Sequence, residues 1–237
     1  MKSLFILLKD YFFELLYPRN LTCVLCHSEV DGKELCDVCL GSIQFNTGRV
    51  CGSCGRMILS GAYPVCENCK TLNRYYDRGI SVVTYDEYIK KLIFNFKYHD
   101  KRYIAHTMAG YMLKEIINLD LDIEFDSIVP VPLHETRFKS RGFNQAELIS
   151  HFLSEMTGLK VDTSLKRISN TKPLNKLSSE ERHDVLSDAF ELTESIKKNI
   201  ILIDDIFTTG ATVNACALKL KEMGSGFVLV ATFAVGE

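Results

Sequence analysis

The stretch Ile200–Ala217, IILIDDIFTTGATVNACA, decides the fold of this chain. Its first residues are apolar and β-branched, which predicts a buried strand over 199–204 that leads into two adjacent acids, Asp204 and Asp205. After a short polar loop, apolar residues recur at helical spacing and predict a helix over 211–223. A strand that leads through a loop into a helix is an α/β unit, and open α/β sheets bind ligands at the carboxyl ends of their strands.

The loop between this strand and helix has the chemistry of a phosphate site. Gly210 permits a close backbone approach, and the hydroxyl groups of Thr208, Thr209 and Thr212 are available as donors. The start of the helix adds unpaired N–H groups and the positive end of the helix dipole. The two carboxylates can accept hydrogen bonds from sugar hydroxyls or from waters around Mg²⁺. The chain contains neither a Walker loop nor a dinucleotide fingerprint, so those two kinds of nucleotide site are not indicated.

The rest of the chain continues the alternation of strands and helices. Strand patterns occur over 79–85, 127–131 and 227–235, and helical patterns over 89–96, 103–117 and 146–156. Residues 166–188 hold few large apolar side chains and predict a mobile loop. The 237 residues are 46% hydrophobic, an ordinary composition for a globular protein. The predicted fold class is therefore α/β, with a mostly parallel sheet flanked by helices.

The near-neutral total charge of −2 hides an uneven distribution of charged residues. Residues 89–102, 134–145 and 166–182 carry net charges of +4, +2 and +3, and residues 115–126 offset them with −5. Charge runs are usually solvated faces. Because these basic segments lie beside predicted α/β elements, they favour a site for a polyanion.

Aromatic residues alternate with the first of these basic segments. Helical spacing predicts that Phe94 and Phe96 belong to the core. Tyr98 and Tyr103 remain as candidates for stacking on nucleic-acid bases.

Nine cysteines, in a chain without tryptophan, are the unusual feature of the composition. Eight of them form four C-x-x-C pairs before residue 70: Cys23/Cys26, Cys36/Cys39, Cys51/Cys54 and Cys66/Cys69. Two such pairs complete a tetrahedral Cys₄ zinc site. A disulfide framework is the alternative, but it needs an oxidising compartment, and residues 1–17 lack the small-residue cleavage site of a signal peptide. The pattern predicts structural Zn²⁺ and a cytoplasmic protein, and leaves open sequential or cross-braced pairing and one zinc or two.

Three further features complete the predicted organisation. The ninth cysteine, Cys216, shares a helix face with Ala217 and Leu220 and is predicted to be a core residue. Residues 4–16 form an amphipathic pattern, either a helix docked on the protein or a peripheral contact with the inner face of the membrane. The predicted boundaries are an N-terminal helix over 1–19, a four-knuckle zinc module over 20–75 and an α/β domain over 76–237.

A second block, residues 126–147, reads DSIVPVPLHETRFKSRGFNQAE and follows a predicted strand. Arginine makes planar, bidentate contacts with phosphate, so this block suits a pyrophosphate group beside the phosphate loop. The candidate residues of this block are Arg137, Arg141, Gly142, Asn144 and Gln145. Lys97, from the preceding basic segment, is a further candidate for contact with the same group.

The strand with two acids and a T-T-G-x-T loop closely resembles the 5-phosphoribosyl-1-pyrophosphate (PRPP) motif of the type I phosphoribosyltransferases. This resemblance implies that Asp204 and Asp205 face the ribose hydroxyls of Mg²⁺-bound PRPP. It also implies that Thr208, Thr209, Gly210, Ala211 and Thr212 hold its 5′-phosphate.

Taken together, the knuckles, Lys97 in FKYHDKRYIA, the 126–147 block, the LSSEER segment and the terminal loop resemble the ComF family of competence proteins, of the ComFC type. The resemblance implies a role in natural transformation, the handling of incoming single-stranded DNA, and the competence helicase ComFA as a partner. An enzyme that transfers a phosphoribosyl group is the favoured reading of the site, although no stretch identifies the acceptor. The alternatives are a metabolic phosphoribosyltransferase with a nucleobase or amine acceptor, and an inactive module that senses PRPP.

Overall fold

The computed structural model describes residues 21–33, 35–58, 64–70, 73–98, 101–169, 189–194 and 198–236. Contacts divide the chain into two units, Met1–Ile43 and Gln44–Glu237, and each is described by itself. The helix predicted over 4–16 and most of the loop predicted over 166–188 lie outside the described residues. Among the described helices, none is both long and apolar enough to cross a bilayer.

The smaller unit is built around cysteines. Its described part contains one short helix, α2 (Asp37–Gly41), and an antiparallel bridge between Thr22 and Glu29. The side chains it buries are few and small: Cys23, Val24, Leu35, Cys39 and Ile43. A segment with so little apolar surface depends on metal ligation for its stability.

The larger unit contains a five-stranded sheet in the order β1-β7-β6-β2-β3, in which every neighbouring pair is parallel. Its strands are β1 (Arg78–Thr84), β2 (Ser127–Pro130), β3 (Lys160–Val161), β6 (Ile200–Phe207) and β7 (Val228–Val235). Every residue of β7 is buried, as expected for a parallel strand that is covered on both faces. The predicted α/β class with a mostly parallel sheet is confirmed.

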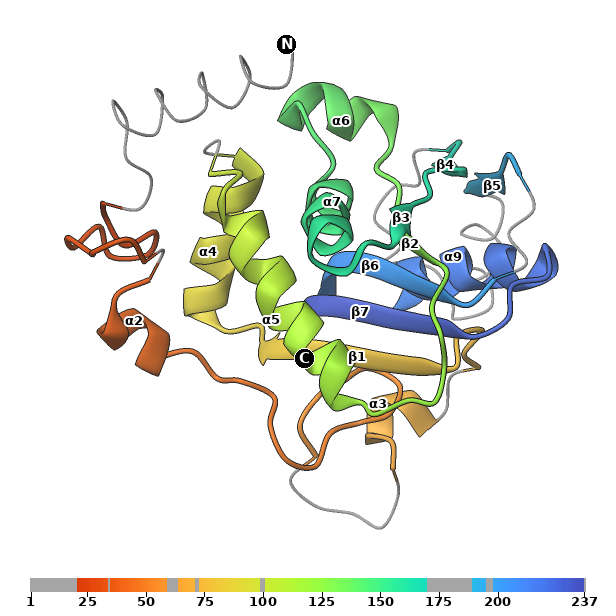
Figure 1. Ribbon diagram of the computed structural model, residues 1–237, viewed down its shortest axis with the longest axis horizontal. Coiled ribbons are helices and arrows are strands. Elements are labelled where there is room, and N and C mark those ends of the chain that lie inside the picture. Colours follow the sequence, from red (N-terminus) through yellow and green to blue (C-terminus); the bar gives the residue numbers. More distant parts are fainter. Residues whose placement is uncertain are drawn as a thin grey trace. The chain divides into compact units, whose positions relative to one another are not determined.

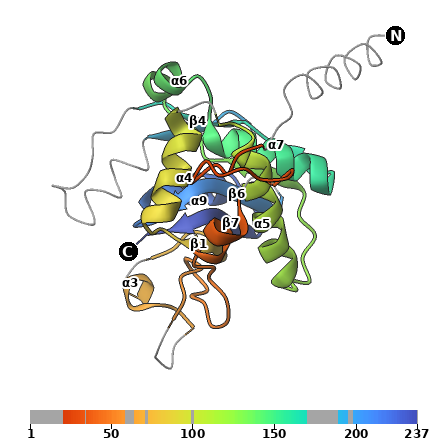
Figure 2. The same cartoon turned by 90° about the vertical axis from the view of Figure 1, so that its left-hand side faces the viewer.

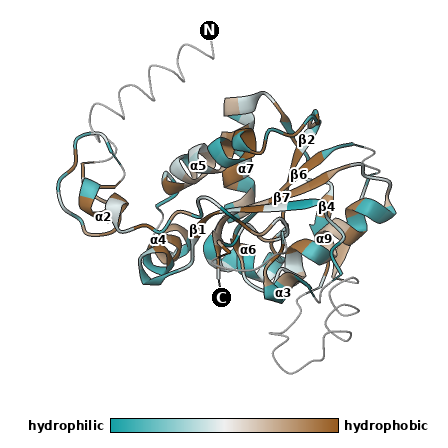
Figure 3. Cartoon of the chain, turned by 90° about the horizontal axis from the view of Figure 1, so that it is seen from below, coloured by the Kyte–Doolittle hydropathy of each residue, from teal (hydrophilic) through white to brown (hydrophobic). Residues whose placement is uncertain are grey.

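Helices cover both faces of the sheet. Helices α5 (Ile104–Asn118) and α7 (Gln145–Thr157) pack against each other and against one face, while α9 (Ala211–Glu222) lies on the other (Figures 1 and 2). Colouring by hydropathy shows apolar strands between helices whose outer sides are hydrophilic (Figure 3). Each helix thus buries an apolar stripe on a continuous apolar sheet.

The order of the strands reverses between β2 and β6. The chain leaves β2 through α7 toward β3 at one edge, and it leaves β6 through α9 toward β7 on the opposite side. Connections that diverge in this way open a crevice outside the carboxyl ends of the two strands, which is where ligands bind in open α/β sheets. Helices α4 (Glu87–Tyr98) and α6 (Glu135–Arg141) follow the carboxyl ends of β1 and β2.

Several elements differ from those predicted. Strand β6 continues through both acids to Phe207, because it keeps its parallel pairing with β7 as far as Val235. Helix α6 was not predicted, and neither was the hairpin of β4 (Leu165–Arg167) with β5 (Phe190–Leu192), which lies partly within the predicted loop. The short strands carry too few residues for a period-2 pattern to be recognised.

The prediction that Phe94 belongs to the core is wrong. Its side chain is 53% exposed, whereas that of Phe96 is fully buried. Residues two apart on a helix point about 200° apart, so both cannot face the interior of the protein. The buried stripe of α4 is made of Ile89, Leu92, Ile93 and Phe96.

The segment that carries the last two cysteine pairs packs directly on β1. We call residues 50–58 and 64–70, which include helix α3 (Glu67–Lys70), the second ribbon. The Gly79 N–H donates to the Gly52 carbonyl at 2.8 Å, and the Ser81 hydroxyl donates to the Cys54 carbonyl at 2.7 Å. The second ribbon therefore belongs to the larger unit, where it is hydrogen-bonded to the edge strand β1.

Candidate functional site

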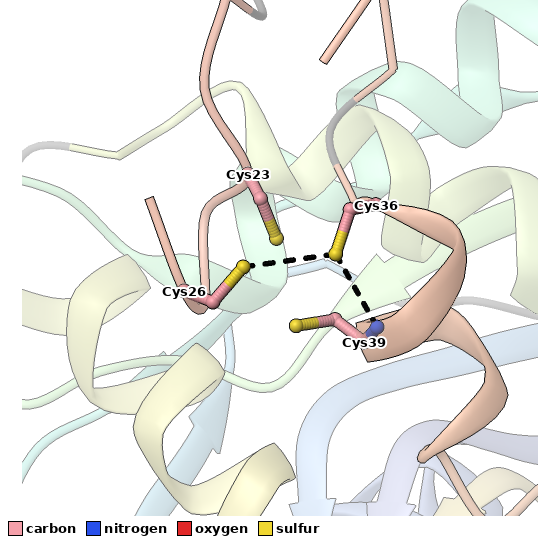
Figure 4. A group of neighbouring side chains, drawn as sticks. All are labelled: Cys23, Cys26, Cys36 and Cys39. Carbon is pink, nitrogen blue, oxygen red and sulfur yellow. Dashed lines mark hydrogen bonds between the residues drawn. The ribbon is translucent and has the colours of Figure 1, made fainter. Parts of the chain in front are cut away.

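The eight paired cysteines form two groups whose sulfur atoms converge. They are Cys23, Cys26, Cys36 and Cys39, the first cluster (Figure 4), and Cys51, Cys54, Cys66 and Cys69, the second cluster. All sulfur atoms within a cluster lie within 4.8 Å of one another, with Sγ–Sγ distances of 3.6 Å for Cys26–Cys36 and 3.7 Å for Cys54–Cys66. A tetrahedron of Zn–S bonds of ~2.3 Å places its sulfur atoms about 3.8 Å apart. The clusters fit one Zn²⁺ ion each, with sequential pairing of the knuckles.

Local hydrogen bonds lower the pKa of three of these thiols, Cys26, Cys36 and Cys51, and so favour the thiolate form that zinc requires. The Cys39 N–H points to Cys36 Sγ at 3.4 Å, and the Cys66 N–H points to Cys51 Sγ at 3.2 Å. The Ser28 hydroxyl lies 3.0 Å from Cys26 Sγ, and this contact lowers the pKa of the Cys26 thiol to about 6. A thiol that loses its proton near neutral pH is ready to bind a metal.

The predicted phosphate loop, Thr208–Thr212, lies at the carboxyl end of β6 and opens α9. Thr208 and Thr209 are exposed. Helix α9 begins at Ala211, whose N–H donates to Thr209 Oγ1 at 3.3 Å, and its N-cap residue Gly210 has no side chain to accept the N–H groups that follow. Gly210 has a left-handed φ of +76°, and a Cβ atom there would lie 2.3 Å from the Phe207 ring and 2.6 Å from Arg74 Nη1. Only glycine fits this turn, and because its N-cap has no side chain, the first turn of the helix leaves N–H groups beyond Ala211 for an anion.

The two acids point to opposite faces of the sheet, because they are neighbours within a strand. Asp205 is buried, and its Oδ2 lies 2.6 Å from Lys97 Nζ on α4. The structure thus brings together two predicted site residues that are far apart in the sequence. A cation held against a buried carboxylate is also positioned to meet the charge of a phosphate at the same edge.

Asp204 occupies a different environment from its neighbour. Burial and, after it, the negative charge of Asp205 raise the pKa of its carboxyl group to about 7, and its Oδ1 accepts the Asp205 N–H at 2.9 Å. Near neutral pH this carboxyl therefore exchanges a proton readily. Cys216 on α9 is fully buried, which confirms it as a core residue, and burial raises the pKa of its thiol.

The predicted pyrophosphate block divides into residues that shape a turn and residues that present charge. Gly142 ends α6 with a φ of +78°, and Asn144 caps α7 by accepting the Ala146 N–H at 3.1 Å. Asn144 Nδ2 also donates to the Val131 carbonyl at 3.1 Å, and Gln145 is buried. Gly142, Asn144 and Gln145 therefore have clear structural roles in joining α6 to α7.

Arg141 and Arg137 are the charged members of the block. Arg141 donates from Nη1 to Gln145 Oε1 at 3.0 Å and from Nη2 to the Tyr98 hydroxyl at 3.2 Å. Its guanidinium carbon lies 5.3 Å from the centre of the Tyr98 ring. Arg137 is exposed on α6. These contacts join α6 to the end of α4, next to Lys97.

Arg167 on β4 joins the site but was not singled out from the sequence. Burial lowers the pKa of its guanidinium group; the nearby charge of Arg137 acts in the same direction and that of Asp204 in the opposite one. Its guanidinium carbon lies 5.4 Å from the centre of the Phe190 ring on β5. The available signal was the net charge of residues 166–182, but the short strand that orients Arg167 had no recognisable pattern.

Several known proteins are similar to this chain. The double zinc ribbon domain family matches residues 12–70. The competence protein ComFC of Bacillus subtilis is 30% identical over 239 residues, covering 90% of this chain and 95% of that protein. The DNA utilization protein YhgH of Salmonella typhimurium is 29% identical over 204 residues, covering 83% and 88%. Among solved structures, a purine phosphoribosyltransferase of Pyrococcus horikoshii is similar over 55% of this chain and 73% of its own, with 14% identity and a TM-score of 0.34.

The fold and the two clusters define an α/β protein that joins a parallel sheet to a double zinc ribbon. The similarity to ComFC, at 30% identity over nearly the whole of both chains, identifies the family. The chain belongs to the ComFC family of competence proteins.

Proposed function

We propose that this chain binds PRPP with Mg²⁺ in the crevice between the carboxyl ends of β2 and β6. The observation that carries the proposal is the start of α9 after Gly210, an N-cap residue without a side chain, directly beside an acidic pair on β6. In this proposal the ribose hydroxyls are assigned to Asp204 and Asp205, which would reach the ligand from opposite faces of β6, and the 5′-phosphate to Thr208–Thr212. Transfer of the phosphoribosyl group to an acceptor stays a prediction from the sequence.

The cations beside this crevice suit the pyrophosphate group of PRPP. Lys97 approaches from α4, Arg137 and Arg141 from α6, and Arg167 from β4. Their combined charge attracts a polyanion and, in a partly buried site, is screened less than exposed charge is. Departure of pyrophosphate would be stabilised by the same groups.

We expect PRPP–Mg²⁺ binding to release protons and to strengthen as the pH rises from 6 to 8. The pKa of the free Asp204 carboxyl is raised to about 7, so this group is partly protonated near neutral pH. Donation from ribose hydroxyls and the charge of Mg²⁺ favour the ionised form, so binding expels the proton. Isothermal titration calorimetry in buffers of different ionisation enthalpy measures the number of protons released.

Asp204→Asn is the control for this experiment. The Asn side-chain oxygen can still accept the Asp205 N–H, so the strand keeps its local hydrogen bond. This variant is expected to bind PRPP at least tenfold more weakly and to release no proton. Equal proton release by Asp204→Asn and the unaltered chain would contradict the role given to Asp204, and absence of PRPP binding by the unaltered chain would contradict the proposal itself.

We further propose that the same edge of the molecule handles single-stranded DNA. Phe94 and Tyr98 on α4 are 53% and 52% exposed, with ring centres 5.1 Å apart, and Arg141 covers the Tyr98 ring. Exposed aromatic rings next to arginine and lysine are the usual platform for unstacked bases and their phosphates. The names of two relatives, a competence protein and a DNA utilization protein, support this function.

Tyr98→Ala is expected to weaken binding of single-stranded DNA roughly tenfold, because one stacked base contributes about 1–3 kcal/mol. Fluorescence anisotropy with a labelled oligothymidine at fixed salt measures the affinity. Tyr88→Ala is the matched control. Tyr88 is 46% exposed on the same helix but lies at the opposite end of α4 from Tyr98. Equal affinities for the two variants would exclude the Tyr98 surface as the contact.

Three predictions concern the wider setting of the protein. A competence helicase as partner, a cytoplasmic location and a membrane contact by residues 4–16 stay predictions from the sequence.

A further inference from the structure

Arg74 lies between the second cluster and the phosphate loop and contacts both. Its Nη2 donates to Cys69 Sγ at 3.5 Å, and its Nη1 donates to the Thr209 carbonyl at 3.3 Å. The guanidinium carbon lies 5.5 Å from the centre of the Phe207 ring and 5.9 Å from that of Tyr76. The guanidinium group is thus held by two aromatic rings and by two hydrogen-bond acceptors, which together restrict its movement.

The contact with the Thr209 carbonyl has a direct consequence for the loop. In a trans peptide the C=O and the following N–H point in opposite directions. Because the Thr209 carbonyl points to Arg74, the Gly210 N–H points away from Arg74. Arg74 thereby fixes the orientation of a peptide at the point where α9 begins and an anion is expected.

Other hydrogen bonds besides those of Arg74 join the phosphate-loop region to the second ribbon and to the segment that follows it. The Tyr75 N–H donates to Asn214 Oδ1 at 2.8 Å, and Asn214 Nδ2 donates to the Asn73 carbonyl at 3.1 Å, so the first turn of α9 is bound to the segment that leaves the second ribbon. Arg56 of the second ribbon donates to the Gly236 carbonyl, and the Gly236 N–H donates to the Phe207 carbonyl at 2.8 Å. The loop is therefore tied to the second ribbon at both of its ends.

We propose that the second cluster positions the phosphate loop through Arg74, so that zinc in this cluster supports PRPP binding. Arg74 acts as a positioning residue: it binds a thiolate ligand of the cluster and orients the loop peptide. The role of the second cluster then goes beyond folding stability. The inference rests on the proposed PRPP site for its functional consequence, but the coupling between cluster and loop can be measured without PRPP.

Hydrogen–deuterium exchange of the full-length, zinc-loaded chain tests the coupling directly. Arg74→Gln is expected to raise amide exchange in the peptide that contains Thr208–Thr212, and to weaken PRPP–Mg²⁺ binding about tenfold. Arg74→Lys keeps the charge but cannot donate to two acceptors from one planar group. It is therefore expected to restore only part of the loop protection and only part of the PRPP–Mg²⁺ affinity. Arg78→Gln is the matched control, because Arg78 also lies beside the second ribbon, with Nη1 toward Gly52, but stands at the opposite end of β1 from the loop.

Zinc removal provides a second, independent arm. Extraction of zinc with a chelator is expected to raise loop exchange strongly in the unaltered chain. The rise is expected to be smaller in Arg74→Gln, where the direct link from Cys69 to Thr209 is already broken and only the flanking hydrogen bonds remain. Loop exchange in Arg74→Gln equal to that of Arg78→Gln would overturn the proposal, as would an equal response of both chains to zinc removal. If the unaltered chain fails to bind PRPP while the exchange results hold, the proposed function fails and the coupling stands.

Discussion

Gly79→Ala is expected to cost more than about 4 kcal/mol and to prevent the second ribbon from seating on β1. A Cβ atom at this position would lie 1.9 Å from the Ser53 carbonyl oxygen and 2.6 Å from its carbon. These are backbone atoms of a segment that the second cluster holds in place, so no side-chain rotation can relieve the clash. Displacement of the ribbon would also break the hydrogen bond between the Gly79 N–H and the Gly52 carbonyl. Soluble yield, zinc content and denaturant unfolding measure the effect.

Gly110→Ala is the matched control for this substitution. Gly110 lies within α5, where no atom beyond the adjacent backbone of the same helix comes within 4 Å of an added Cβ, so alanine is expected to stabilise the helix by up to about 1 kcal/mol. The two exchanges are chemically identical and differ only in the space around them. An unfolding midpoint for Gly79→Ala as high as that for Gly110→Ala would show that the second ribbon does not pack on β1.

Periodic features of this chain were predictable from its sequence because they are local. The strand patterns that became β1, β6 and β7 and the helical patterns that became α5 and α7 each contain enough residues to show a period. The pairs of cysteines were equally clear, since C-x-x-C spacing forms a knuckle whatever surrounds it. Which knuckles share a metal is a question of three-dimensional proximity, and the structure answers it with two sequential clusters.

Contacts that assemble the site could not be predicted in the same way. Arg74 and Thr209 are separated by 135 residues, and nothing in the neighbourhood of either one marks the other as its partner. Lys97 was a candidate because the family motif contains it, and its ion pair with Asp205 became visible only once α4 and β6 were placed. A long-range contact between single polar side chains leaves no repeating pattern, so sequence periodicity carries no information about it.

Lys97→Met is expected to reduce the free energy of unfolding by about 3 kcal/mol at neutral pH, because it leaves a buried carboxylate without its cation. The side chains of Lys97 and Asp205 are only 17% and 10% exposed. Lys90→Met is the control on the same helix: its partner Glu87 lies 3.2 Å away, but the two side chains are 59% and 80% exposed, so the loss is expected to stay below about 0.5 kcal/mol. Denaturant unfolding of both variants makes the comparison, and equal losses would contradict the buried pair.

The double variant Lys97→Met with Asp205→Asn separates stability from function. Neutralising both members removes the uncompensated charge, so this chain is expected to regain most of the stability lost by Lys97→Met alone. It is not expected to regain PRPP binding, because both the cation for pyrophosphate and one carboxylate for the ribose are gone. A double variant as unstable as Lys97→Met would mean that the methionine itself disturbs packing. Recovery of stability without recovery of binding would instead show that the ion pair is retained for the ligand and not for the fold.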